Sequence, residues 1–257
     1  MSRPQQELIQ RAIELLANSR RAVALTGAGI STPSGIPDFR SPSSGLWSQV
    51  NPMVVASKWG FRANPQAFYE WIAPLAEQML TALPNPAHLA LAELEGLGKL
   101  HAVITQNIDS LHQRAGSQRV LELHGHARQA FCVRCQHAVP TDQVLEQWRI
   151  TQRVPRCPEC GGVLKPAVVL FGDLLPHDVW QAAENEARHC DVMLIAGSSL
   201  EVAPASDLPL MAYHAGARLI LVNYQPTPLD HLMEVALYAD VAEALPAIAA
   251  GVREAIQ

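Results

Sequence analysis

The chain has 257 residues, of which 49% are apolar, and a formal net charge of −5. This length allows one large domain with a smaller satellite and a sizeable buried core. The negative charge argues against nucleic acid or an anionic membrane as the main partner, and no apolar run reaches the length of a membrane span. The N-terminal residues lack the basic and apolar regions of a signal peptide, so we expect a cytoplasmic protein.

Apolar residues at helical spacing predict helices, and short apolar runs predict strands. The first elements are a helix over 7–19, a strand over 22–26, a long loop over 35–60, and helices over 65–82 and 86–96. Strands over 100–105 and 121–123 follow. Beyond residue 166, strands over 167–171, 192–196 and 218–222 alternate with helices over 176–188, 204–215 and from about 241. This alternation predicts an α/β fold, a Rossmann-like parallel sheet with helices on both faces.

Residues 127–166 have a different composition, with four cysteines and few large apolar residues. The cysteines form two Cys-x-x-Cys pairs, at Cys132 and Cys135 and at Cys157 and Cys160. Two such pairs complete a tetrahedral thiolate site, and four thiolates leave no open position, so we predict one structural Zn²⁺. With zinc bound, this segment would form a small zinc-ribbon and helical lobe beside the sheet. The alternative is that the four cysteines are unrelated free thiols.

The first strand leads into Gly27, Ala28, Gly29, Ile30 and Ser31. Two glycines one residue apart allow a tight turn whose N–H groups approach a pyrophosphate. The usual dinucleotide fingerprint places a third glycine and a helix after this turn, whereas this chain breaks any helix early with two prolines. The turn opens instead into an irregular loop that carries Asp38, Phe39 and Arg40. An enzyme that attacks the dinucleotide itself suits such a loop; a surface ion pair and a core aromatic are the plainer interpretation.

Ligands bind at the carboxyl ends of parallel strands, so the loops after residues 26, 105, 196 and 222 should meet at one crevice. Besides the glycine turn, these loops carry Gln106, Asn107, Ile108, Asp109, Gly197, Ser198, Ser199, Asn223, Tyr224 and Gln225. Their amides and hydroxyls suit a ribose or a carboxamide, and equally suit helix caps and turns. His124, at the junction with the cysteine segment, is a candidate general base. The chain has ten histidines, and the alternative is that His124 has no chemical role.

Taken together, the motifs resemble those of the sirtuin family, the NAD-dependent protein lysine deacylases. The matching segments are GAGIS (27–31), GIPDFR (35–40), TQNID (105–109), HG (124–125), the two Cys-x-x-Cys pairs, KPAVVLFGD (165–173), GSSLEVAP (197–204) and VN (222–223). The resemblance implies that NAD is consumed as a co-substrate, and that deacylated lysine, nicotinamide and O-acyl-ADP-ribose are formed. It also implies acylated-lysine proteins or peptides as partners, and we expect a monomer with no nucleic-acid or membrane partner.

The resemblance also implies roles for individual residues. His124 would activate a ribose hydroxyl, Asn107 would position the ribose and a water, and Asp109 would hold the carboxamide. The other implied contacts are Gly27 to Ser31 and Arg40 for the phosphates, Phe39 for the reactive ribose, Ser198, Ser199, Asn223 and a residue near Val241 for the adenosine half, and Val168 and Phe171 for the acyl-lysine peptide.

Two expectations concern substrate and organisation. Relatives that remove succinyl or malonyl groups carry a Tyr and, three residues on, an Arg; this chain has Tyr69 but Ile72, so we expect acetyl or other uncharged acyl groups. The Rossmann-like domain would comprise 1–34, 86–126 and 167–257, interrupted by a cofactor-loop and helical segment over 35–85 and the zinc module over 127–166.

Three rival functions stay open at this point. The first is an ADP-ribosyltransferase on the same site, and the second is a nucleotide-binding oxidoreductase, against which the missing third glycine weighs. The third is a zinc-ribbon module that binds nucleic acid or protein, against which the net negative charge weighs.

Overall fold

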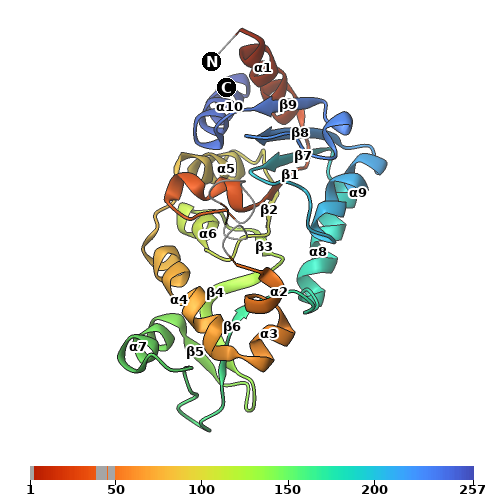
Figure 1. Cartoon of the computed structure of the whole chain (residues 1–257). Helices are drawn as coiled ribbons and strands as arrows, with labels where there is room; N and C mark the ends of the chain where they lie inside the picture. The colour runs from red at the N-terminus through yellow and green to blue at the C-terminus, as the bar shows by residue number, and fades with distance from the viewer. Residues whose placement is uncertain (1–2, 39–44, 46–49) are drawn as a thin grey trace.

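The computed structural model describes residues 3–38, 45 and 50–257, and it has two lobes (Figure 1). The larger lobe contains a six-stranded sheet and both ends of the described chain. The smaller lobe contains a three-stranded sheet with short helices. Phe39 and Arg40, which the sequence analysis expects to contact the ribose and the phosphates, lie outside the described residues.

The large sheet has the strand order β3-β2-β1-β7-β8-β9, and every neighbouring pair is parallel. Its strands are β1 (Ala22–Thr26), β2 (Ala102–Thr105), β3 (Val120–Glu122), β7 (Val192–Ala196), β8 (Arg218–Asn223) and β9 (Val235–Tyr238). The sequence predicts all of these strands except the edge strand β9, and it also predicts a strand over 167–171 that does not belong to this sheet. The order reverses between β1 and β7, which is where a doubly wound sheet binds its ligand.

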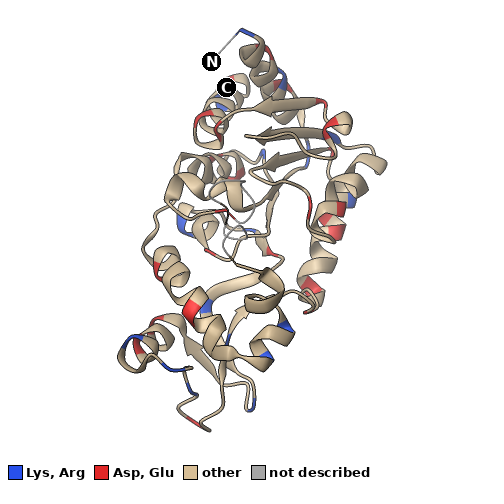
Figure 2. Ribbon diagram, viewed as in Figure 1, with Lys and Arg blue, Asp and Glu red and all other residues tan. Residues whose placement is uncertain are grey.

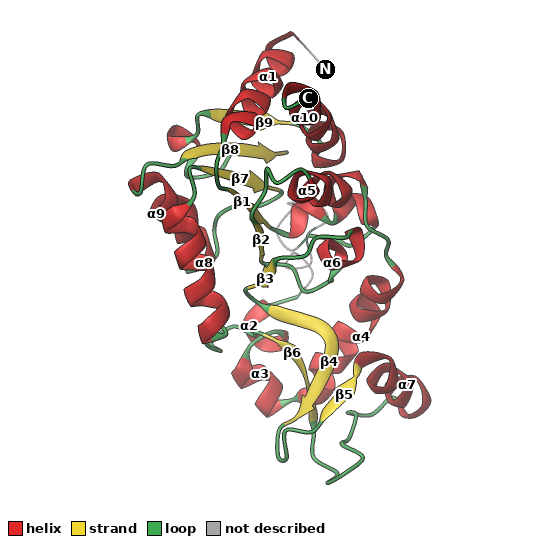
Figure 3. Cartoon of the chain, turned by 180° about the vertical axis from the view of Figure 1, so that it is seen from behind, coloured by secondary structure: helices red, strands yellow, loops and turns green. Residues whose placement is uncertain are grey.

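Helices cover both faces of this sheet (Figures 1 and 3). On one face lie α1 (Arg3–Asn18), α5 (Pro86–Gly96) and α10 (Val241–Ala255), and on the other lie α8 (His177–His189) and α9 (Leu208–His214). Side chains of β1 alternate between them, since Ala24 packs into the first core whereas Val23 and Leu25 pack into the second. A strand buried on both faces reads as a continuous apolar run, as β1 does.

The smaller lobe is built on an antiparallel sheet of order β5-β4-β6, whose strands are Ala138–Pro140, Gly125–Cys132 and Leu164–Val168. Around it pack α2 (Pro52–Val55), α3 (Lys58–Ala63), α4 (Pro65–Thr81) and α7 (Thr141–Thr151). Its core centres on Phe68 and Tyr69 of α4. The remaining helix, α6 (Leu111–Ala115), follows β2 and contacts α5.

Two sequence expectations are wrong in this part of the fold. The loop expected over 35–60 contains α2 and the start of α3, because Asn51 and Ser57 cap these helices through Met53 N and Gly60 N, at 2.9 and 3.0 Å. Such caps compensate the short length of each helix. The strand expected over 167–171 ends at Val168, and it pairs antiparallel with β4 rather than joining the parallel sheet.

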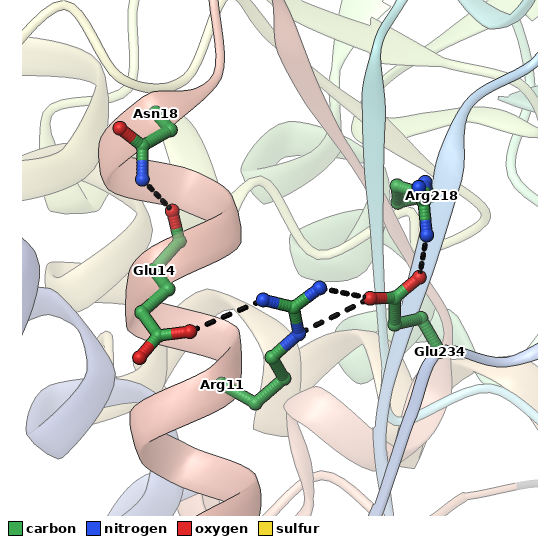
Figure 4. A network of polar contacts seen from close by, with 5 residues as sticks. All are labelled: Arg11, Glu14, Asn18, Arg218 and Glu234. Atoms are coloured by element: carbon green, nitrogen blue, oxygen red, sulfur yellow. Dashed lines mark hydrogen bonds and ion pairs between the residues drawn. The ribbon is translucent and has the colours of Figure 1, made fainter.

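A network of charges ties α1 to the sheet (Figure 4). The Arg11 guanidinium donates to the carboxylates of Glu234 and Glu14, and Arg218 of β8 donates to the other oxygen of Glu234. Across the molecule, positive and negative residues are interspersed on both lobes (Figure 2). Within the described residues, no helix combines the length and the apolar character that crossing a bilayer requires.

Candidate active site

Three glycines bring β1 and β7 into close contact at the point where the strand order reverses. Gly29 N–H donates to the Gly197 carbonyl oxygen at 2.8 Å. A Cβ on Gly197, whose φ is +61°, would lie 2.2 Å from the Ile30 nitrogen, and one on Gly27 would lie 2.8 Å from the Gly197 oxygen. Only glycine fits this approach, which leaves a floor of backbone at the carboxyl ends of the strands.

A cavity of about 720 Å³ extends from this floor to the smaller lobe. Most of the residues predicted from the sequence line it: Gly27, Ala28, Gly29, Ser31, Asp38, Gln106, Asn107, Ile108, Asp109, His124, Val168, Phe171, Gly197, Ser198, Ser199, Asn223, Tyr224 and Gln225. The fold therefore gathers residues from four strand ends and from β6 around one space.

Three predicted residues lie away from the cavity wall. The Ile30 side chain is buried among the helices of the larger lobe, and Val241, at the start of α10, is buried in the same core. The Tyr69 hydroxyl donates to the Leu164 carbonyl oxygen at 2.8 Å, and its ring stacks on Trp148. Their side chains therefore contribute to packing rather than to the surface of the cavity.

A buried polar network supports the floor of the cavity. The amide nitrogen of Asn107 donates to the Gly27 carbonyl oxygen at 3.0 Å and to Ser31 Oγ at 3.1 Å. Ser31 Oγ donates in turn to the Asp109 carboxylate at 2.6 Å. These bonds use both amide protons of Asn107, so its side-chain oxygen is what it offers to a ligand. Burial raises the pKa of Asp109, against the hydrogen bonds from Ser31 and from Leu111 N–H.

Two histidines behind this network have no counterpart among the sequence predictions. His112 Nε2 lies 2.9 Å from Thr26 Oγ1, His88 Nε2 lies 3.5 Å from Ser31 Oγ, and the two rings are 4.9 Å apart. Burial lowers the pKa of His88 to about 4 and that of His112 well below its usual value. Both rings are therefore neutral near pH 7 and act as fixed hydrogen-bonding groups. The signal for His88 was the Asn85-Pro86 start of α5, where His88 completes a capping box with Asn85.

His124 stands where the two lobes meet, just before β4. Its Nδ1 atom lies 2.8 Å from the Gln106 carbonyl oxygen. A carbonyl only accepts, so this bond places the proton on Nδ1 and leaves Nε2 as the basic nitrogen. The Gln106 side chain donates to Ser198 Oγ at 3.0 Å, which connects the residue that holds His124 to the β7 end of the cavity.

The far wall of the cavity is apolar and comes from α4. Ile72 lines it, together with four residues that the sequence analysis does not assign to the site: Phe68, Trp71, Leu75 and Met79. They recur at helical spacing, which indicates an apolar face but does not tell a core from a cavity wall. This wall presents no cationic side chain from α4.

The four paired cysteines converge in the smaller lobe. Their sulfur atoms all lie within 4.8 Å of one another, and neighbouring pairs lie 3.4 to 3.7 Å apart. Ligands about 2.3 Å from a tetrahedral zinc ion lie about 3.8 Å apart, so the four thiols fit one Zn²⁺. The fifth cysteine, Cys190, is buried beside α8, and burial raises the pKa of its thiol to about 12.

A glycine-lined switch point above a polar network is the arrangement of a dinucleotide-binding α/β protein, and here a metal-binding lobe forms the opposite wall. A family model described as the Sir2 family matches residues 27–204, and the chain belongs to this family.

Relatives of this chain have names that describe NAD-dependent protein deacylases or deacetylases. An Archaeoglobus fulgidus protein named NAD-dependent protein deacylase 2 is 48% identical and covers 93% of this chain and 94% of its own. A Caldivirga maquilingensis protein named NAD-dependent protein deacetylase is 45% identical, over 92% of this chain and 90% of its own length. Among solved structures, one from a study of the mechanism and regulation of Sir2 enzymes is 46% identical, with a TM-score of 0.91 and coverage of 97% and 99%. A Sir2 complex with a p53 peptide and NAD⁺ is 41% identical, with a TM-score of 0.86 and coverage of 92% and 95%.

Proposed function

We propose that this protein is an NAD-dependent protein lysine deacetylase that prefers uncharged acyl groups. One observation carries the proposal: a single cavity joins a glycine-lined strand-end floor, a histidine with a fixed tautomer and an apolar wall. The names of the relatives agree with this activity. When bound, NAD supplies an activated ribose whose nicotinamide can be displaced by the acyl oxygen of the substrate.

The protein residues hold the two reactants in this geometry. The backbone from Gly27 to Ser31 and at Gly197 lies beside the pyrophosphate, since glycines at a switch point let a phosphate approach the main chain closely. Asn107 directs its side-chain oxygen toward the ribose, and Asp109 accepts from the carboxamide. Ser198, Ser199 and the loop from Asn223 face the adenosine half, because they line the cavity at the carboxyl ends of β7 and β8.

His124 acts as the general base in this proposal. Its Nε2 atom takes a proton from a ribose hydroxyl, and the Gln106 carbonyl keeps the ring in the tautomer that this step requires. The same carbonyl stabilises the imidazolium that forms, because it accepts the Nδ1 proton in both charge states. Val168 and Phe171 hold the peptide, whereas α4 surrounds the acyl group with apolar side chains.

The zinc site has a structural role in the proposal. Four thiolates leave no coordination position for a substrate, so Zn²⁺ holds β4 and the segment before β6 together. Cys132 lies at the end of β4, whose first residue follows His124. The metal therefore stabilises the lobe that carries the wall of the cavity. We further propose that the protein acts as a monomer in the cytoplasm and without nucleic acid.

Mass spectrometry of an acetyl-lysine peptide, incubated with the protein with and without NAD, tests the activity directly. NAD-dependent loss of the acetyl group with formation of O-acetyl-ADP-ribose supports the proposal. Transfer of ADP-ribose to protein without loss of acetyl would favour the transferase instead. No loss from acetyl, propionyl or longer acyl peptides would overturn the deacetylase assignment.

A further inference from the structure

Residues 168–173 form a strip of chain, and every residue of this strip lines the cavity. Backbone hydrogen bonds hold this strip from two sides. Val169 N–H donates to the His124 carbonyl oxygen at 2.9 Å, and Phe171 N–H donates to the Ala56 carbonyl oxygen at 2.9 Å. The strip therefore runs between the residue proposed as base and the segment that leads into α3.

One side chain from outside the cavity joins the two ends of this strip. Lys165 Nζ donates to the Val168 carbonyl oxygen at 2.9 Å and lies 3.0 Å from the Asp173 carboxylate. Asp173 in turn accepts from Leu170 N–H at 3.2 Å, and its own N–H donates to the Leu170 carbonyl oxygen at 2.8 Å. The ammonium group thus links the start of the strip to the turn that ends it.

The surroundings make this link stronger than an ordinary surface ion pair. The side chains of Lys165 and Asp173 are each 27% exposed, and both charges are hydrogen-bonded to backbone as well as to each other. Charge-assisted hydrogen bonds of this kind exceed neutral ones, whereas fully exposed pairs contribute little. Loss of the ammonium group would leave the Val168 oxygen and the Asp173 carboxylate without their shared donor.

We propose that Lys165 is a positioning residue for the acylated peptide, acting through residues 168–173. The identity of the ligand rests on the proposed function, whereas the ordering of the strip does not. In this proposal Lys165 holds the strip in the conformation that binds the backbone of the peptide. NAD binds elsewhere, at the floor of the cavity formed by the ends of β1 and β7. Its removal should therefore weaken peptide binding and leave NAD binding unchanged.

Hydrogen exchange tests the ordering of the strip without any turnover. In Lys165→Met, amides of residues 168–173 should exchange about tenfold faster while those of the larger lobe stay unchanged, because hydrogen exchange reports local opening of each segment separately. Lys165→Arg should restore protection. Lys99→Met is the matched control, since Lys99 Nζ also donates to a backbone oxygen, that of Ala17, in the larger lobe. Exchange in 168–173 equal to that of the unaltered protein would overturn the proposal.

Binding measurements test the consequence for the substrate. For Lys165→Met, and for Asp173→Asn as a second variant, the Kd of an acetyl-lysine peptide should rise about fivefold to tenfold while the Kd of NAD stays within about twofold. A parallel loss of both affinities would indicate general destabilisation and contradict the proposal. If the unaltered protein shows no NAD-dependent deacylation, the proposed function fails, and the exchange experiment still decides whether Lys165 orders the strip.

Discussion

The Nδ1 atom of His124 lies 2.8 Å from the backbone carbonyl oxygen of Gln106, which belongs to the loop after β2. The Gln106 side chain donates to Ser198, at the end of β7, so one residue orients His124 and contacts the other side of the floor. The orientation of the His124 ring therefore depends on the parallel sheet and not on the smaller lobe alone.

Replacement of His124 by alanine should reduce deacetylation about 10²-fold to 10⁴-fold, the usual contribution of a positioned general base. NAD binding should change little, because the glycine turn and the network around Asn107 stay intact. Turnover and an NAD binding isotherm, measured on the same preparation, check both points. His126→Ala is the control, since His126 lies two residues further along the chain, in β4, and does not line the cavity. A drop of less than about tenfold in the His124 variant would remove this residue from the proposed role.

The sequence predicts the strand-end residues because their position is encoded locally. A buried apolar run followed by polar residues places Asn107 and Asp109 at the carboxyl end of a parallel strand, whatever the rest of the chain does. Tyr69 shows the limit of this reasoning. It lies on the apolar side of α4 as Ile72 does, but the Leu164 carbonyl, distant in the sequence, draws its hydroxyl into the core.

The pair of buried histidines has no local signal in the sequence, for a related reason. His88 and His112 lie in different helices, and only packing of α5 against α6 brings their rings to 4.9 Å. The sequence predicts a loop between residues 35 and 60 because α2 and α3, of four and six residues, are too short to show the spacing of apolar residues typical of a helix. Their caps, Asn51 and Ser57, are the local signal that remained.

The apolar wall of α4 leads to a prediction about the acyl group. A succinyl carboxylate would lie against the apolar side chain of Ile72, and α4 offers no cation to pair with it. Acetyl-lysine peptides should therefore react faster than matched succinyl-lysine peptides. Ile72→Arg should raise the succinyl-to-acetyl ratio of kcat/KM by at least about tenfold. Leu75→Arg, one turn further along the same wall, controls for the position of the charge. Faster removal of succinyl by the unaltered protein would contradict the prediction.

The cysteine cluster predicts one zinc ion per chain. Metal analysis should find about one Zn²⁺, and Cys157→Ser should lower this content and make the smaller lobe sensitive to protease, because the metal would join the two cysteine pairs of that lobe. The buried residue Cys190 provides the control, as Cys190→Ala removes a thiol outside the cluster and should keep the metal. Equal zinc content in the two variants would be incompatible with a site of four thiolates.

The neutral histidines make stability depend on pH. The pKa of His88 is about 4 in the folded protein and about 6.5 in the unfolded chain, so between these values the unfolded state binds more protons. The free energy of unfolding should therefore fall as pH decreases through this range, by up to about 1.4 kcal/mol per pH unit for each such histidine. Asp109 acts in the opposite direction, since its raised pKa favours the folded state at low pH.

Urea unfolding at about pH 7, 6 and 5 measures this dependence. His88→Gln should flatten the slope, because glutamine keeps a hydrogen-bonding side chain but does not titrate. His214→Gln, at an exposed position, should leave the slope as it is. A slope that is the same in all three proteins would show that the His88 ring binds protons equally in the folded and the unfolded protein over this range, and would contradict the prediction.

The contact between Gly29 and Gly197 predicts how the floor responds to an added methyl group. Gly197→Ala should abolish measurable NAD binding, because the new Cβ would lie 2.2 Å from the Ile30 nitrogen and would push β1 and β7 apart. Gly98→Ala is the matched control: Gly98 also has a positive φ, +70°, but a Cβ there meets nothing within 4 Å. Both variants carry a backbone strain of about 1 kcal/mol, so a difference between them in NAD affinity reports the close approach of the strands. Equal NAD affinity in the two variants would mean that the sheet accommodates the methyl group, and that the glycine is needed only for its backbone conformation.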